Sequence, residues 1–308
     1  MSIDRSTIIR GPAVVEFDSQ VFYSQGDIIA TPTLDTFDIN TSIFGKVDER
    51  LSDIAWDIVL TPVGEWEALT VLFPYANPTI GQSIFGASDK DLVIQSLAGQ
   101  KMTFKAAAVV AMPNIICSAT KTLLGQVTFR AIGANDTAWS DSAKRAAVAA
   151  QAFSDTSFDA SNVKTQPYSV AWGSTPPWDD IQTEEGVTVS FDINLQDVNT
   201  DTDGRVDQTM GGVGVMARMT PVGISESQLL SLLKIQDTGI QRGVSLGGNK
   251  NDLVVTGTGV SVTVYDAAPK EAPFRWGQTV LRAGEVGFVA IRKFSAGAVQ
   301  ALFAVSAS

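Results

Sequence analysis

The chain has 308 residues, with 33 acidic and 22 basic side chains, a net charge of −11, no histidine and one cysteine. The acidic excess disfavours capture of nucleic acid through neutralised phosphates. The lack of histidine excludes Ser–His–Asp catalysis, Cys–His catalysis and histidine-based zinc sites. Cys117 has no partner for an internal disulfide, and its apolar neighbours predict a small core residue rather than a reactive thiol.

The N-terminus has no basic segment followed by an apolar core, so we expect no signal peptide. No stretch approaches the ~20 apolar residues that a membrane-spanning helix needs. The sequence therefore predicts a soluble, non-secreted chain with no membrane partner.

Long-range repetition is the strongest signal in the sequence. The segment LTPVG at 60–64 returns as MTPVG at 219–223, and 219 − 60 gives an offset of 159. Residues 125–132 return at 284–291 with the same offset. The segment FDIN at 37–40 returns at 191–194 (offset 154), and DLV at 91–93 returns at 252–254 (offset 161). We infer a duplicated domain. The expected units are 1–132, a connector at 133–166, and 167–308, and each domain is large enough to bury its own core.

The first half begins with an expected strand at 11–18 and continues with a long β-hairpin from Ile28 to Leu60. Pro32 suits an edge strand or a bulge. Residues 41–53 are polar without strand periodicity, so we expect an extended loop there, followed by a half-buried strand at 54–60. In the second half the equivalent loop is expected at 195–212. It should be five residues longer, because the offset steps from 154 to 159.

A short amphipathic helix is predicted at 65–73, where Pro74 ends it. Its counterpart begins with a capping box from Ser225 to Gln228 and continues through Leu233. Each helix is expected to cover its own sheet. Further strands are predicted at 92–94, 101–110 and 125–132, echoed at 253–255, 260–265 and 284–291. Residues 141–153 are strong helix formers, which predicts a helical connector. The expected fold class is mainly β with short helices.

Several motifs point to chemistry but are incomplete. The acidic run from Asp197 to Gly204 resembles a calcium loop, but Met210 stands where a bidentate glutamate is needed, so a solvated hairpin tip is the preferred interpretation. Glycines at 211–214 lack the Lys-Ser/Thr of a phosphate loop. Glu184 and Glu185 should face opposite sides of a strand. We therefore predict no catalytic residue, no metal, no cofactor and no enzymatic activity.

The order of first strand, hairpin at 28–60, flanking helix at 65–73 and further strands resembles the tail tube proteins of long-tailed bacteriophages, in their tandem-domain variety. The resemblance implies two tail-tube-like β-sandwich or barrel domains, each with one flanking helix. It also implies a structural virion protein in the tail, assembled in the host cytoplasm. Its partners would be copies of itself in trimeric, pseudo-six-fold rings, other tail proteins, and double-stranded DNA that passes without specific binding. An acidic lumen lets a polyanion slide without trapping it.

Under this interpretation the two polar hairpin loops contact the adjacent ring. The candidate contact residues are Phe44, Lys46, Asp48, Glu49, Arg50, Asp201, Asp203, Arg205 and Asp207. Two alternatives remain open. One is another tail ring component, such as a distal tail or terminator protein. The other is a β-sandwich adhesin or carbohydrate-binding module with exposed Trp172 and Trp178, although Phe17 at the position equivalent to Trp172 favours a core role.

Overall fold

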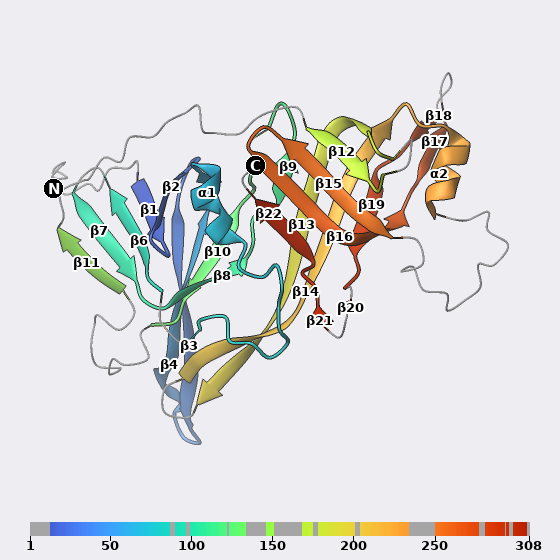
Figure 1. Ribbon diagram of the computed structural model, residues 1–308. Coiled ribbons are helices and arrows are strands. Elements are labelled where there is room, and N and C mark those ends of the chain that lie inside the picture. Colours follow the sequence, from blue (N-terminus) through green and yellow to red (C-terminus); the bar gives the residue numbers. More distant parts are fainter. Residues whose placement is uncertain are drawn as a thin grey trace.

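The structure is a computed structural model of the chain, shown in Figure 1. It describes residues 13–86, 90–96, 99–121, 123–133, 146–150, 168–174, 178–200, 204–233, 250–276, 281–292, 294–295 and 298–306. The predicted fold class is confirmed, because the described residues are mainly β-strands with short helices.

The first half, together with strand β11 of the connector, supplies two sheets. One has the strand order β11-β7-β6-β1-β2-β5, and the other has the order β3-β4-β10-β8. The bounds of its elements are β1 (Ala13–Phe17), β2 (Gln20–Ser24), β3 (Ile29–Thr41), β4 (Gly45–Leu60), β5 (Pro62–Val63), α1 (Trp66–Leu69), the 3₁₀ turn η2 (Thr70–Leu72), β6 (Leu92–Ser96), β7 (Gln100–Phe104), β8 (Ala107–Ala111), β9 (Ile115–Cys117), β10 (Val127–Ala131) and β11 (Ala146–Ala150).

The second half forms one larger sheet, ordered β12-β15-β16-β19-β14-β13-β9, with β22 also paired to β16. The strand at one edge of this sheet, β9, comes from the first half. Its elements are β12 (Ser169–Trp172), β13 (Gln182–Thr200), β14 (Gly204–Val222), α2 (Glu226–Leu233), β15 (Asn251–Gly257), β16 (Val260–Glu271), β17 (Phe274–Trp276), β18 (Leu281–Ala283), β19 (Val286–Ala290), β20 (Phe294–Ser295), β21 (Ala298–Val299) and β22 (Phe303–Ser306).

Strand pairing repeats between the halves with the offset seen in the sequence. Leu60 of β4 lies opposite Val127 of β10. Met219 of β14 lies opposite Val286 of β19. Both positions shift by the same amount, since 219 − 60 and 286 − 127 each equal 159. Within each half, therefore, equivalent strands pair with each other in the same register.

The two long hairpins differ from the predicted loops. Most of each predicted loop is instead paired strand: residues 45–53 belong to β4, and residues 195–200 and 204–212 belong to β13 and β14. Residues 201–203 lie outside the described residues. Thr41 pairs with Gly45, and Thr200 pairs with Gly204. Residues 41–52 lack a strand pattern because both faces of the hairpin are exposed there, so no buried side alternates with a polar one.

The predicted five-residue insertion is also wrong. Both hairpins carry bulges at matching places, after Asp35 and Ile39 in the first and after Asn194 and Val198 in the second. Because 194 − 35 and 198 − 39 both equal 159, the hairpins align without an insertion. The FDIN echo at offset 154 is a coincidence of composition. An odd shift of five would place each side chain on the opposite face.

The expected helical connector is contradicted in the part that the structure describes. Residues 146–150 form strand β11, which pairs with β7 at the edge of the first sheet. The rest of 141–153 lies outside the described residues. Pairing with an open sheet edge therefore outweighs the helix propensity of the alanines in this segment.

The predicted flanking helices are present. Helix α1 and η2 cover 66–72, and α2 covers 226–233. The capping box at α2 is confirmed: Ser225 Oγ accepts from the backbone N–H of Gln228 at 3.3 Å, and Gln228 Oε1 accepts from the backbone N–H of Ser225 at 2.8 Å.

One hydrophobic core runs through both halves. The ring of Phe73, after η2, lies 5.6 Å from that of Phe191 on β13, and Phe191 lies 4.7 Å from Phe303 on β22. Trp66 Nε1 donates to the carbonyl oxygen of Ser306 at 3.0 Å. The relative position of the halves is therefore fixed by shared packing and hydrogen bonds.

Gly186 allows β9 to approach β13. It has a φ of +90°, and a Cβ at this position would lie 2.1 Å from the carbonyl oxygen of Cys117. We expect Gly186→Ala to lower the free energy of unfolding by about 2 kcal/mol or more, measured by denaturant unfolding. Gly212→Ala is the matched control, because its added Cβ would meet nothing within 4 Å. Equal stability of the two variants would contradict this account of the junction.

Candidate assembly surfaces

The second-half hairpin, β13–β14, is covered by the first half. The backbone N–H of Gly81 donates to the carbonyl oxygen of Met210 at 2.8 Å, and the N–H of Ile84 donates to the carbonyl oxygen of Gln208 at 2.9 Å. Ser83 Oγ adds a hydrogen bond to Asp207 at 2.8 Å. The segment 81–84 therefore pairs with the outer part of β14 much as a short strand would.

Charge pairing strengthens the same contact. The side chain of Arg205 is only 12% exposed. Its guanidinium lies 3.2 Å from the carboxylate of Asp197 and 3.5 Å from that of Asp35. Asp53, 7% exposed, lies 4.0 Å away. Asp35 and Asp53 belong to β3 and β4, so Arg205 joins the tip of the second hairpin to the middle of the first.

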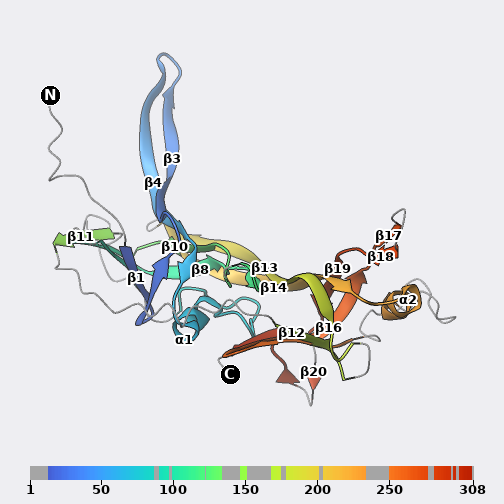
Figure 2. The same ribbon diagram turned by 90° about the horizontal axis from the view of Figure 1, so that it is seen from above.

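Among the described residues, no segment pairs in this way with the outer part of the first-half hairpin, β3–β4. Figure 2 shows it projecting from the rest of the chain, whereas β13–β14 lies along the body. Large hydrophobic side chains are exposed along it, and only three others among the described residues are comparably exposed. Those on the hairpin are Ile29, Leu34, Phe37, Ile43, Phe44, Val47 and Leu51. Exposed apolar side chains gathered on one projecting element are typical of protein–protein contact surfaces.

Equivalent positions make this contrast quantitative. Leu51 and Met210 correspond, since 210 − 51 equals 159, yet Leu51 is 46% exposed and Met210 is 2% exposed. Leu34 corresponds to Ile193, since 193 − 34 equals 159. Leu34 is 54% exposed, whereas Ile193 packs against the core. Covering each leucine would contribute about 1 kcal/mol at ~25 cal/mol per Å² of apolar area.

The residues predicted to contact the next ring fall into two groups. Phe44, Lys46, Asp48, Glu49 and Arg50 lie at or near the exposed tip of β3–β4. Lys46 pairs with Asp38 and Glu49, and Arg50 pairs with Asp48, all on the surface. The pKa of Lys46 is raised by its hydrogen bond to Asp38, and the pKa of Glu49 is lowered by its bond with Lys46.

The second group belongs to β13–β14. Arg205 and Asp207 bind Asp35 and Ser83 of the first half, so both make contacts within the chain. Asp201 and Asp203 lie outside the described residues. Asp197, which begins the calcium-like run, accepts from Gln208 Nε2 at 2.5 Å and pairs with Arg205. Its carboxylate therefore serves protein contacts.

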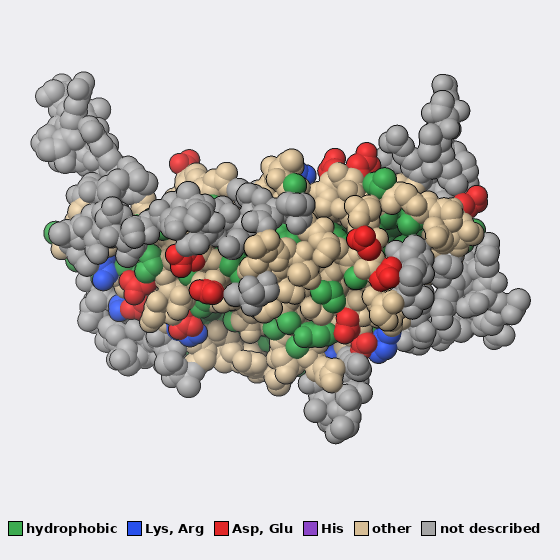
Figure 3. All heavy atoms as spheres, turned by 45° about the horizontal axis from the view of Figure 1, so that its top comes forward, with side chains coloured by type: hydrophobic (Ala, Val, Ile, Leu, Met, Phe, Trp, Pro, Cys, Tyr) green, Lys and Arg blue, Asp and Glu red, His purple; other side chains and the backbone are tan. Residues whose placement is uncertain are grey.

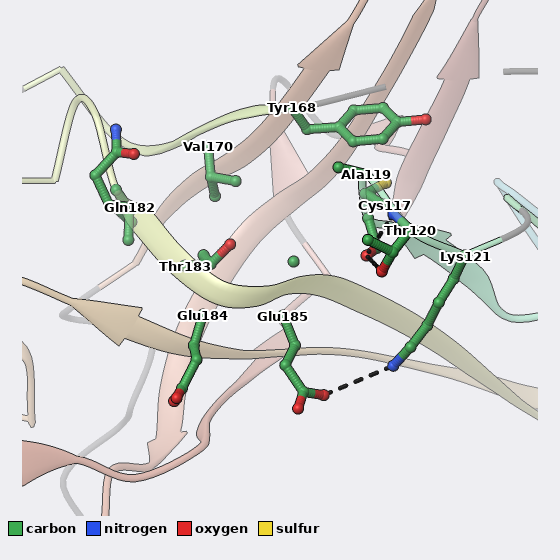
Figure 4. Close-up of a pocket in the computed structure, with 13 residues that line it drawn as sticks. Cys117, Ala119, Thr120, Lys121, Tyr168, Val170, Gln182, Thr183, Glu184 and Glu185 are labelled. Carbon is green, nitrogen blue, oxygen red and sulfur yellow. Dashed lines mark hydrogen bonds and ion pairs between the residues drawn. The ribbon is translucent and has the colours of Figure 1, made fainter. Parts of the chain in front are cut away.

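A cavity of about 400 Å³ lies at the junction of β9 and β13, lined by Cys117, Lys121, Tyr168 and the strand from Gln182 to Gly186 (Figure 4). Glu184 and Glu185 point to the same side in this view, contrary to the expected alternation, because the pairing with β14 shifts between Thr183 and Val187. Glu185 pairs with Lys121 at 3.6 Å, and both side chains are largely exposed.

Two other sequence expectations are settled by burial. Cys117 is a buried core residue, as predicted, and burial raises the pKa of its thiol to about 12. Trp172 and Trp178 are 4% and 9% exposed, and Trp172 Nε1 donates to the carbonyl oxygen of Ala267 at 2.7 Å. Neither tryptophan presents a sugar-binding face.

Sequence reasoning missed the strand β9 and its role between the halves. Residues 115–117 are three apolar residues, too short a run for strand periodicity. The repeated glycines Gly125 and Gly284 were the available sign of these hairpins. The backbone N–H of Gly125 donates to the carbonyl oxygen of Asn114, and that of Gly284 donates to the carbonyl oxygen of Pro273.

Comparison with known proteins gives no identification. No protein-family model matches the chain, and no curated protein matches it. None of the described helices is both long enough and apolar enough to cross a membrane.

Arg205 and Lys46 occupy equivalent positions, since 205 − 46 equals 159, which makes them a matched pair for mutation. Arg205→Gln leaves Asp53 buried beside Asp35 and Asp197 without a cation. We expect it to lower the free energy of unfolding by about 2 kcal/mol, a value discounted for the exposure of Asp35. Lys46→Gln should leave the denaturant midpoint unchanged because its ion pairs are exposed. The reverse order would contradict the assignment of Arg205 to the junction.

Cys117 gives a test of the folded junction. At mildly alkaline pH, well below its raised pKa, the thiol stays protonated and covered, so an alkylating reagent should not label the folded chain. The same reagent should label one thiol after denaturation, read by intact mass. Stoichiometric labelling of the folded protein would show that β9 opens from β13.

Proposed function

We propose that this chain is the structural subunit of a bacteriophage tail tube, a stack of rings through which double-stranded DNA passes from capsid to host. One observation carries the proposal. The hairpins β3–β4 and β13–β14 have equivalent register, but among the described residues only β13–β14 is covered by the other half of the chain. A chain with this asymmetry can repeat the covered contact only by binding another copy of itself.

The interface implied is head-to-tail rather than two-fold. The first half covers β13–β14 within the chain, so a second half from a neighbour is the matching cover for β3–β4. Such heterologous contacts generate closed rings or open helices. With two equivalent domains per chain, a six-fold arrangement closes with three chains.

The charge of the chain supports the proposed passage of DNA. On the face in Figure 3, acidic side chains are spread over both halves, with basic ones at fewer places. A net charge of −11 repels a polyanion and so opposes its capture on the wall of a channel. In this proposal the protein has a structural role and no enzymatic one.

The tip of β3–β4 is proposed to join successive rings. Ile43 and Phe44 are 81% and 79% exposed there, at the end of the projecting hairpin. Replacing both with serine should leave a folded protein that forms rings but stacks into tubes far less, as measured by electron microscopy of the purified chain. Ile80→Ser is the control, because Ile80 is 71% exposed but lies outside the hairpin.

The unaltered protein should form long tubes in the same experiment. Single rings without tubes would favour a distal tail or terminator protein. Compact monomers at every concentration would contradict the proposed function, and tubes of normal length from the tip variant would remove its hairpin from ring stacking.

A further inference from the structure

The junction between the halves is a strand addition. Strand β9 of the first half pairs antiparallel with the outer edge of β13. Val187 lies opposite Cys117, and Val189 lies opposite Ile115. A hairpin holds β9 in place, since the N–H of Ile116 donates to the carbonyl oxygen of Leu123 at 2.7 Å. The first half is thus a donor of one strand, and the second half is its acceptor.

The second half carries the same donor hairpin. In the first half, Ile115 bridges to Leu124; in the second, Phe274 of β17 pairs with Ala283 of β18. The offsets agree, since 274 − 115 and 283 − 124 both equal 159. In the part of the chain that the structure describes, β17 pairs only with β18. Its other edge corresponds to the edge that β9 gives to β13.

The first half carries the same acceptor edge. Val189 on β13 is opposite Ala217, and Ala30 on β3 is opposite Ile58. Since 189 − 30 and 217 − 58 both equal 159, the residues that receive β9 correspond to 28–30. Strand β3 is the outermost strand of its sheet among the described residues. Ile29, within this edge, is 58% exposed.

Pro32 sets the length of this edge. The N–H of Ile116 points to Leu123, so its neighbours Ile115 and Cys117 point their backbone groups toward β13. Residues 28 and 30 correspond to Val187 and Val189, so their backbone N–H and C=O groups point away from β4, toward the open edge of β3. The backbone of Pro32 faces the same edge, but proline has no N–H to donate. An added strand therefore ends near Ala30, which matches a donor of three residues.

We propose that β17 of one chain adds to the outer edge of β3 in the next chain, with Ile28 opposite Trp276, Ile29 opposite Arg275 and Ala30 opposite Phe274. The inference rests on the proposed function, because it takes the neighbour to be the next chain of a ring. In both ribbon views β3 and β17 lie toward opposite ends of the molecule. The contact therefore joins two chains rather than one chain to itself.

A disulfide across this contact tests the register. Ile29 and Arg275 correspond to Thr188 and Ile116, a pair whose backbone groups point away from each other. Cα atoms in such a pair lie about 4.5 Å apart, within disulfide reach. Ile29→Cys combined with Arg275→Cys should give, after assembly and oxidation, covalent species that end at three chains on a non-reducing gel. A mixture of the two single variants should give dimers only.

Ala30→Cys with Arg275→Cys is the matched control, since adjacent side chains point to opposite faces and this pair should not cross-link. Rings seen by microscopy with no cross-link between positions 29 and 275 would overturn the strand register and leave the proposed function standing. If the unaltered chain forms no ring, both the strand register and the proposed function are contradicted.

Hydrogen exchange on the unaltered protein keeps the test independent of the variants. On ring assembly the N–H groups of Ile28 and Ala30 should become at least tenfold slower to exchange, because each gains a partner on β17. Exchange of Thr33, beyond Pro32 on the same strand, serves as the internal reference. Unchanged exchange at both Ile28 and Ala30 in assembled rings would overturn the proposal.

Discussion

Unpaired backbone groups at strand edges determine how the sheets of this chain are joined. An edge strand presents unpaired N–H and C=O groups, which a protein must cover, shorten or interrupt. The chain meets this need at β13 by adding β9 from its other half, and Gly186 permits the close approach. Among the described residues no strand pairs with the outer edge of β3, which Pro32 interrupts.

In the proposed assembly, duplication extends this local requirement from one chain to its neighbours. Equivalent halves carry equivalent donors and acceptors, but a single chain can join only one donor to one acceptor. The remaining acceptor edge at 28–30 and the remaining donor at 274–276 lie on different halves. Leu34 and Leu51 are exposed on the same unsatisfied half, where their counterparts Ile193 and Met210 are covered. The open strand edge and the exposed leucines therefore both support the proposed contact with a neighbouring chain.

Much of the fold is readable from the sequence because local signals agree with tertiary pairing. Repetition at an offset of 159 marks the strands that pair equivalently, and the Ser225–Gln228 box marks the start of α2. The failures occur where tertiary contacts decide. The alanine-rich segment 146–150 forms a strand because it pairs with the edge strand β7. The polar ribbon at 41–52 shows no period because neither of its faces is buried. Strand β9 is too short to signal itself.

The candidate contact residues also separate into those that the sequence predicts and those that tertiary contacts decide. Phe44 and its charged neighbours are exposed at a hairpin tip, as their composition indicates, whereas Arg205 and Asp207 bind the other half through contacts that no sequence pattern specifies. A reconstruction of the assembled ring tests whether the proposed contact between chains repeats the junction inside the chain. We expect three chains per ring, six domains related by successive rotations of about 60°, and superimposable β9–β13 and β17–β3 junctions. Six chains per ring, or neighbouring chains that meet through surfaces other than β3 and β17, would contradict it.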